Sequence, residues 1–400
     1  KADTGITQSI GAAITGTTLR AQANGDITLD QDNDLDSVTL LYSQFGDISY
    51  SDIDGFSFDP TVYGDIWTTG TMTLRAGSTG GISQTGAGLR AGTLIVSAGG
   101  DIVLGELNRT DVLGAPSSGG SAFTVVNDGD LDITGDISVT GPLGALSLTS
   151  NSGAVNQIAG EIDASVVHGS AAGDFTLTSF TGALGNIASS AGDIDISNTG
   201  DITLFGLLQT GRANSVTLVG SGGGIWHGIG RIETGTLNLS AVTGIALDGA
   251  QGNDIDRLGV VGTGSNFTFA DDNNFALTGD ITISSIGGHV GLRSNGGAIT
   301  QTGGVITAHD LNLHAAAGLD LSGANQVVKV TIANGATGAV VFSNARALTV
   351  LGATSTGDVT ISTSTGLLTL NDVTTGGLIR LAGAGGVFGR GAAPPAGGRD

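Results

Sequence analysis

Apolar and polar residues alternate with a period of two along most of the chain, in short segments that begin with Gly-Asp. Seven segments share the pattern Gly-Asp, Ile or Val, any residue, then a further aliphatic residue, at residues 25–29, 100–104, 135–139, 192–196, 200–204, 279–283 and 357–361. A period of two is that of a β-strand with one buried face. The Gly-Asp pair is typical of the turn before such a strand. No segment combines a helical period with helix caps, so the pattern predicts an all-β chain.

A longer repeat is superimposed on these strands. Near copies of the segment Gly-Ile-Thr-Gln place an anchoring apolar residue at intervals of 76, 73, 70 and 74 residues, at Ile6, Ile82, Val155, Ile225 and Ile299. A super-repeat of about 74 residues divides into four coils of about 18 to 19 residues, which is typical of a solenoid. We therefore expect a parallel β-helix of about 21 coils, each rising by the strand spacing of about 4.8 Å.

The repeat also predicts the domain organisation. Residues 1–390 are expected to form a single β-helical rod with super-repeats starting near residues 6, 82, 155, 225 and 299. The last super-repeat is longer, as if one extra coil at residues 365–371 had been inserted before Val387. Residues 391–400 are expected to be a tail or linker, because the adjacent prolines Pro394 and Pro395 cannot continue a hydrogen-bonded ladder.

Composition and charge narrow the classes of function. Apolar residues make up 39% of the chain, which is too apolar for a disordered protein. The net charge of −22, with only 14 Lys and Arg, argues against binding to nucleic acid or to acidic membranes. The lack of Cys excludes disulfides and thiol chemistry. No apolar run is long enough to suggest a helix that crosses a bilayer, so no membrane-spanning segment is expected.

Several repeated units resemble a known family. Gly-Ile-Thr-Gln-Thr-Gly-like units, Leu-Asn-Leu-x-Ala, Phe-Thr-Phe and Ala-Leu-Thr-Val at residues 347–350 are similar to the repeat region of filamentous-haemagglutinin-like large secreted bacterial exoproteins and adhesins. The resemblance covers nearly the whole chain. It implies a right-handed β-helical stalk that is exported through an outer-membrane translocator to the cell surface or the extracellular space.

One aromatic-rich segment is a candidate ligand site. Tyr50, Phe56, Phe58, Tyr63 and Trp67 alternate with acidic residues, and aromatic faces beside carboxylates can hold a sugar ring. The competing interpretation is structural, because Phe residues recur at a nearly constant interval after the anchors, at Phe45, Phe123, Phe267 and Phe342. We expect this Phe position to lie in the core and residues 50–63 to form an inserted loop.

Trp226 is a second candidate for ligand contact. It stands where the other copies of the repeat have Thr, Ser or Asn, and the alternation places this position on the outer face. A Trp exposed in this way suggests a contact surface.

The position that follows the Trp226 position is Gln or His in all five copies of the repeat, namely Gln8, Gln84, Gln157, His227 and Gln301. We expect these side chains to satisfy backbone groups where the coil turns, because a buried polar group must be hydrogen-bonded.

The densest acidic run is a candidate Ca²⁺ site. Asp30, Asp32, Asp34 and Asp36 place carboxylates at alternate positions, and carboxylate oxygens are the ligands that Ca²⁺ prefers. The EF-hand pattern is not met, since Leu35 and Leu41 stand where it needs Gly and Glu. A solvated acidic loop without metal is the alternative interpretation. No other cofactor is expected.

These observations favour a non-catalytic structural or adhesive segment of a secreted bacterial surface exoprotein, acting as a rigid rod for adhesion or for matrix and fibre formation. Its expected partners are cell-surface or matrix glycans. Two alternatives remain open at this point. One is an extracellular filament subunit that associates end to end, since open sheet edges invite pairing. The other is a β-helical polysaccharide-degrading enzyme, although no nucleophile motif or catalytic cluster is recognisable.

Overall fold

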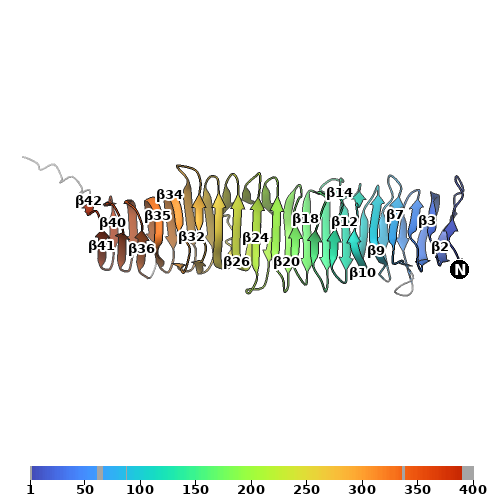
Figure 1. Ribbon diagram of the computed structural model, residues 1–400, viewed down its shortest axis with the longest axis horizontal. Helices are drawn as coiled ribbons and strands as arrows, with labels where there is room; N and C mark the ends of the chain where they lie inside the picture. Colours follow the sequence, from blue (N-terminus) through green and yellow to red (C-terminus); the bar gives the residue numbers. More distant parts are fainter. Residues whose placement is uncertain (1, 61–65, 87, 336–337, 390–400) are drawn as a thin grey trace, which may run out of the picture. The chain divides into compact units, whose positions relative to one another are not determined.

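The computed structural model describes residues 2–60, 66–86, 88–335 and 338–389. The chain divides into two compact units, the first made of residues 1–198 and 203–214, the second of residues 199–202 and 215–400. The described residues form β-strands and no helix. Within each unit the strands lie side by side (Figure 1), and the strand pairs whose register is described are parallel. Each unit is therefore a β-solenoid, and their described turns together number about 18.

The strands of the first unit pair from one turn to the next in ladders. One ladder contains β1 (Ile6–Thr7), β3 (Ile27–Ser43), β4 (Ile48–Asp52), β7 (Thr71–Ala76) and β9 (Arg90–Ala98), with β6 (Ile66–Trp67) between β3 and β9. A second contains β2 (Thr15–Ala23), β3, β5 (Phe56–Phe58), β8 (Ile82–Gln84), β10 (Ile102–Leu113), β12 (Ala122–Asn127), β15 (Ala145–Ser150), β18 (Val166–Ala171) and β20 (Ala183–Ser189). A third joins β9 and β10 to β13 (Leu131–Ile133), β16 (Val155–Gln157), β19 (Phe175–Leu177) and β21 (Ile194–Asn198). Shorter pairings involve β11 (Ser117–Ser118), β14 (Ile137–Val139), β17 (Ile162–Asp163), β22 (Ile202–Leu204) and β23 (Leu207–Gln209).

The second unit is built in the same way. One ladder contains β25 (Ile225–His227), β27 (Ile245–Leu247), β29 (Phe267–Asp271), β32 (His289–Ser294), β34 (Ile306–Ala315), β35 (Leu319–Asn334), β37 (Leu348–Ser355), β39 (Leu368–Leu370) and β42 (Val387–Gly389). Another contains β24 (Ser215–Gly220), β26 (Arg231–Ala241), β28 (Asp254–Thr263) and β31 (Ile281–Ile283), which pairs with β34. A third joins β28 to β30 (Phe275–Leu277), β33 (Ile299–Gln301), β35, β36 (Val340–Asn344), β38 (Val359–Thr363) and β41 (Ile379–Gly383), while β40 (Val373–Thr375) pairs with β37.

The core follows from the alternation of the sequence. In β15, Leu146 and Leu148 point inward and are fully buried, while the residues between them lie at the surface. Since parallel register places like residues above one another, each turn adds one rung to ladders of Ile, Leu, Val and Phe. The predicted parallel β-helix is confirmed, and right-handed winding is the hand expected for parallel crossovers. No helix in the described residues is long and apolar enough to cross a membrane.

The turns are longer and fewer than the sequence predicts. Register partners one turn apart, such as Ile27 and Ile48 or Leu131 and Val155, are often further apart along the chain than the predicted coil allows. A turn of three sides needs this length because each side holds a short strand and each corner takes several residues. The predicted coil length and the predicted number of coils were therefore both wrong, the first too short and the second too high.

The super-repeat also has a different structural meaning. Ile6, Ile27, Ile48 and Met72 are successive register partners, so three turns separate Ile6 from Met72. The next anchor, Ile82, lies one strand further along the chain, in the neighbouring ladder. One super-repeat therefore corresponds to three turns plus one side, and not to four turns. The Gln positions of consecutive repeats accordingly lie on different sides of the solenoid.

The same relation holds elsewhere in each unit. Three register steps lead from Ile82 to Leu146, one strand before Val155, and three lead from Ile225 to Val290, one strand before Ile299. From Ile299 three steps reach Val359, and the following strand is β39. The equivalent of the anchor is therefore Leu368 in β39, and Val387 lies one turn above it. The extra coil predicted at residues 365–371 is not an insertion but the regular start of a repeat.

The Gly-Asp pair connects one turn to the next. Asp101 Oδ1 accepts hydrogen bonds from the backbone amides of Ser121 and Ala122, one turn later, at 2.7 and 3.0 Å. A Cβ at Gly120 would overlap Asp101 Oδ1 and the Asp101 backbone nitrogen. The Asp thus caps the next turn, and the Gly of that turn leaves room for the Asp below. Equivalent caps are made by Asp26, Asp47, Asp130, Asp136, Asp174, Asp201, Asn274, Asp280 and Asp358.

The Gln positions satisfy backbone groups at corners, as predicted. Gln157 Nε2 donates to the carbonyls of Gly160 and Ser179, while its Oε1 accepts from the amides of Thr178 and Ser179. His227 makes the same type of contact with Gly230 and with the Gly249 amide.

A second set of corner residues was not predicted from the sequence. Asn325 is fully buried; its Oδ1 accepts the amide of Ile306 at 3.0 Å, and its Nδ2 donates to the carbonyls of Leu321 and Ser343. One amide therefore joins three successive turns. Buried residues that bridge turns in a similar way are Asn33, Asn108 and Asn253.

The structure describes each unit separately, so the single rod predicted over residues 1–390 stays a prediction. The predicted tail at residues 391–400 lies outside the described residues.

Candidate functional site

Four large outward side chains form a column on the first unit. Tyr42, Trp67, Arg90 and Arg109 are successive register partners on β3, β6, β9 and β10. Each is flanked along its strand by two buried residues, as Trp67 is by Ile66 and Thr68. The alternation therefore directs all four side chains outward, and the strand spacing of about 4.8 Å spreads them over about 14 Å. We call this column the aromatic–arginine ladder.

The two aromatic residues of the ladder stack on each other. The ring centroids of Tyr42 and Trp67 are 4.8 Å apart with an angle of 24° between the planes. Offset stacking of this kind stabilises a pair by about 0.5–1.5 kcal/mol beyond the area that it buries. Both residues remain half-exposed, so the pair can offer ring edges and apolar surface to a ligand.

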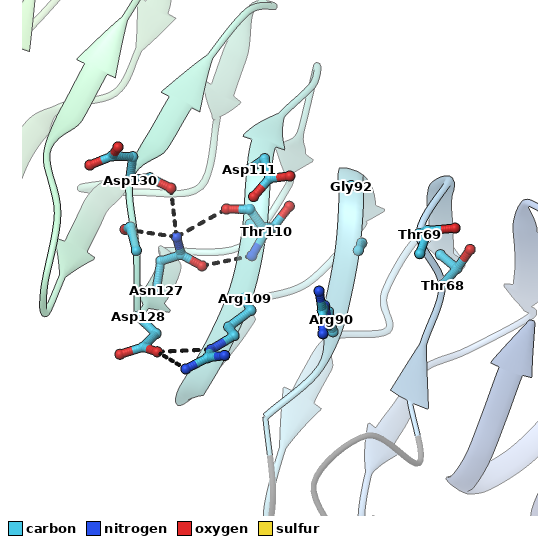
Figure 2. Close-up of a pocket in the computed structure, with 12 residues that line it drawn as sticks. Thr68, Thr69, Arg90, Gly92, Arg109, Thr110, Asp111, Asn127, Asp128 and Asp130 are labelled. Atoms are coloured by element: carbon cyan, nitrogen blue, oxygen red, sulfur yellow. Dashed lines mark hydrogen bonds and ion pairs between the residues drawn. The ribbon is translucent and has the colours of Figure 1, made fainter. Parts of the chain in front are cut away.

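The two arginines differ in their partners. Arg109 donates from Nε and Nη2 to Asp128 Oδ2, at 2.8 and 2.6 Å (Figure 2). Arg90 lies on the adjacent strand and has no carboxylate partner in the described part of the chain. Its guanidinium group therefore keeps all five donors for solvent or for a ligand.

A surface hollow of about 300 Å³ adjoins the arginines. Its lining combines guanidinium groups with hydroxyl, amide and carboxylate groups from Thr68, Thr69, Thr110, Asp111, Asn127, Asp128 and Asp130. The Asn127 side chain is held by the Thr110 amide at 2.9 Å and by the Asp130 carbonyl at 2.9 Å. Thr68, Thr110 and Asn127 are buried and already hydrogen-bonded within the chain. The groups that the hollow offers are therefore the guanidinium group of Arg90, the Thr69 hydroxyl and the carboxylates of Asp111, Asp128 and Asp130. Donors and acceptors of this kind suit a ligand with many hydroxyl groups, such as a carbohydrate.

The aromatic segment predicted as a ligand loop is divided between core and surface. Tyr50, Phe56 and Phe58 are buried and pack edge to face, so the prediction of ligand contact is wrong for these three residues. They point inward because they occupy the inward positions of β4 and β5. Trp67 is at the surface as predicted. Tyr63 lies outside the described residues.

Tyr50 instead belongs to a buried polar corner. Its hydroxyl donates to Asp52 Oδ2 at 2.7 Å, and the amide of Leu35 donates to the same oxygen at 3.1 Å. Burial raises the pKa of both Tyr50 and Asp52. Asp54 nearby is exposed, and the Gly55 amide lowers its pKa. Asp52 therefore serves as a structural cap and not as a surface carboxylate.

The recurrent Phe position is only partly a core position. Phe123, Phe267 and Phe342 are buried, as predicted, but 77% of Phe45 is exposed. Phe45 precedes the Gly-Asp pair at a corner and does not occupy an inward position of a strand, which explains the difference.

Trp226 lies flat on the surface of the second unit. Its outward position in β25 is as predicted, but the side chain is half-buried because its ring covers Gly224 and Gly244. A Cβ at Gly224 would overlap the indole. Trp226 therefore covers backbone that has no side chain of its own at these two glycines. Its role in ligand contact stays a prediction.

The acidic run is a strand and not a loop. Asp30, Asp32, Asp34 and Asp36 are exposed along β3. Side chains two residues apart on one face of a strand are separated by about 6.8 Å, whereas oxygen ligands lie within about 2.6 Å of a Ca²⁺ ion. Among the residues that the structure describes, no group of three or more His, Asp or Glu could hold a metal ion. The geometry thus offers no support for the predicted calcium site.

Asp271 is a buried carboxyl in a second acidic segment, residues 271–274, which the sequence marks as a weaker Ca²⁺ candidate than the run at residues 30–36. It is fully buried, and its oxygens accept the amides of Ile255 and Asn273 at 2.9 and 2.8 Å. Burial raises its pKa to about 7, and the carboxylates of Asp254 and Asp272 add to the rise. Its place at a corner, one turn above Asn253, marks it as structural.

Comparison with known proteins adds no identification. The chain matches no protein-family model, no curated protein and no solved structure.

Proposed function

We propose that the chain is a non-catalytic structural and adhesive segment of a secreted bacterial surface exoprotein, and that the aromatic–arginine ladder is its contact surface for uncharged glycans. The observation that carries the proposal is the column of Tyr42, Trp67, Arg90 and Arg109 beside a polar hollow. Stacking surface next to hydroxyl-binding groups is what carbohydrate recognition requires.

The structural part of the proposal is supported by the way in which the turns hold one another. Apolar ladders, Asp caps and corner amides recur in both units and use only groups of the chain itself. We therefore expect the scaffold to fold without ligand or metal. The resemblance to filamentous-haemagglutinin-like repeats supports an extracellular or cell-surface location and export through an outer-membrane translocator.

Binding can be tested by titrating the purified chain with neutral oligosaccharides and following Trp fluorescence. A Trp226→Phe background leaves Trp67 as the only Trp. We expect saturable binding that weakens at least 10-fold in Trp67→Ala and at least 5-fold in Arg90→Gln. Because Trp67→Ala removes its own fluorescence, that variant is measured by calorimetry.

The control is Arg75→Gln, an exposed arginine of β7 that lies outside the hollow. It should bind like the parent chain. Equal affinity of all the variants, or no binding of any neutral glycan, would remove the adhesive part of the proposal.

The enzyme alternative has a separate test. Neutral and acidic polysaccharides are incubated with the chain, and new reducing ends are counted. Turnover that is lost on substitution of Asp111, Asp128 or Asp130 in the hollow would replace the scaffold proposal with a catalytic one.

A further inference from the structure

The second unit carries a basic groove that is distinct from the ladder of the first unit. Three neighbouring strands, β32, β34 and β35, place three rows of outward side chains next to one another. The middle row contains Gly291, Asn312 and Thr331 and continues to Thr268 on β29. These small or short side chains form the floor of a hollow of about 400 Å³.

Basic side chains stand on both sides of this floor. One side carries the row His289, Asp310 and Lys329, and the other carries Arg293 and His314. His289, Arg293 and His314 line the hollow itself, together with one carboxylate, that of Asp248. Residues four apart on a strand are separated by about 13 Å, so the two sides are far enough apart to admit one sugar ring between them. The grouping is unusual in a chain that has only 14 Lys and Arg against 36 Asp and Glu.

The basic side chains of the groove differ in whether they have a carboxylate partner. The Asp310 carboxylate is shared between His309 Nδ1 at 3.1 Å and Lys329 Nζ at 3.9 Å. Arg293 donates from Nε to Asn295 Oδ1 at 2.6 Å, which fixes the plane of its guanidinium group. No carboxylate of the described residues pairs with Arg293. Its two Nη groups are thus oriented, charged and open to a planar anion.

Gly291 keeps the groove open. An ideal Cβ at this position would lie 3.3 Å from both His289 Nε2 and Thr268 Cγ2. A side chain here would fill the space between the two basic sides. Phe269, Leu292 and Leu313 lie beneath the floor as part of the core. The groove is therefore a formed feature of the folded strands.

We propose that this groove binds a carboxylate-bearing sugar, such as a uronic acid unit of a glycan. A guanidinium group binds a carboxylate through two parallel hydrogen bonds, and Arg293 presents its free Nη groups for that geometry. Asn312, Thr331 and His314 supply groups for the sugar hydroxyls. The net charge of −22 disfavours a densely charged polyanion, so the groove recognises a single acidic unit and not an extended charged chain.

The test uses calorimetric titration of the intact chain with three probes: a galactose tetrasaccharide in which one unit is replaced by galacturonic acid, the uncharged galactose tetrasaccharide, and the same tetrasaccharide carrying one sulfate group. We expect the uronate to bind at least 10-fold more tightly than the other two. Arg293→Gln should lose at least 10-fold in affinity for the uronate, and His314→Ala at least 3-fold. Gly291→Val should abolish binding by filling the floor.

Matched controls separate binding from folding and from the first site. Arg346→Gln removes an exposed arginine of the same unit outside the groove and should leave uronate binding unchanged. Each variant should melt at the temperature of the parent chain, and Trp67→Ala should bind the uronate normally. Equal binding of neutral and acidic probes, preference for the sulfated probe, or full affinity in Arg293→Gln would each overturn the proposal.

Discussion

Gln301 and Asn325 hydrogen-bond to each other through both of their amide groups, Nε2 to Oδ1 at 3.0 Å and Nδ2 to Oε1 at 3.0 Å. Gln8 and Asn33 are paired in the same way, and Gln84 bonds to Asn108. Gln157, by contrast, bonds to backbone groups. In the other three repeats that have Gln, the pair shows a role of the Gln that the repeat alone does not show. It holds in place the buried Asn, which joins the turns.

The corner amide predicts a large loss of stability in Asn325→Ala. The substitution leaves the Ile306 amide and the carbonyls of Leu321 and Ser343 buried without a partner. Each unsatisfied buried group costs about 1–3 kcal/mol, so we expect a loss of about 3 kcal/mol in urea unfolding. The exposed neighbour Gln326→Ala should change stability by less than about 0.5 kcal/mol. Similar effects of the two substitutions would contradict the proposed role of Asn325.

The cap at the Gly-Asp turn predicts a smaller effect in Asp101→Ala. Two backbone amides, those of Ser121 and Ala122, lose their acceptor. Loss of a cap costs about 1 kcal/mol, with a range of about 0.5–2. Asp101→Asn keeps an acceptor oxygen and should recover most of the stability, whereas Asp111→Ala, at an exposed carboxyl, should have no effect. Thermal unfolding followed by circular dichroism would measure the difference.

The Gly of the same motif predicts that Gly120→Ala is more damaging than removal of the Asp. Its Cβ would overlap both the carboxylate and the backbone of Asp101, so two turns would have to separate locally. We expect a loss of about 3 kcal/mol or more, together with faster amide hydrogen exchange in β10 and β12. Gly105→Ala has only one atom within 4 Å of its Cβ, at 3.9 Å, and is the matched control. Wild-type exchange rates in Gly120→Ala would show that the turns can absorb a methyl group.

Asp271 predicts a pH dependence of stability. Its folded-state pKa of about 7 lies above the unfolded value of about 3.9. Ionisation of Asp271 is therefore costly in the folded state. The contribution of Asp271 to the free energy of unfolding falls as the pH rises from about 4 to about 7. Asp271→Asn should remove this component. Relative to the wild type, the variant should gain about 2–4 kcal/mol between pH 4 and pH 8, since one pKa unit corresponds to about 1.4 kcal/mol.

The measurement is urea unfolding at several pH values. Asp320→Asn, at an exposed carboxyl of the same unit, is the control and should follow the wild-type pH profile. If the stability difference between Asp271→Asn and the wild type does not change with pH, the pKa of Asp271 is not raised in the folded state and the prediction is wrong.

The fold could be predicted from the sequence because it rests on local alternation and repetition. The inward Ile and Leu residues, the Gly-Asp turns and the corner Gln residues each act within a strand or between adjacent turns. The number of residues in a turn could not be predicted. A repeat of three turns plus one side has the same period as a repeat of four shorter turns, and only register partners such as Ile48 and Met72 distinguish them.

The candidate sites depend on register and were harder to predict. Trp67 was recognisable as a member of the aromatic-rich segment, but its column with Tyr42, Arg90 and Arg109 joins residues one turn apart by a pairing that the sequence does not display. Phe56 and Phe58 were misplaced because an aromatic-rich segment has the same composition in a core and in a binding loop. The buried Asn residues do leave a signal, since each follows the Gln or His of its repeat at a nearly constant distance along the chain.

The Asp cap has a direction, because each of the caps described above accepts amides from the turn that follows it in the chain. A chain that emerges from a narrow export channel with its N-terminal end first would find, at each step, the acceptor for its next amide already in position. Folding could then advance one turn at a time as the chain appears, and the growing stack itself would oppose backward sliding.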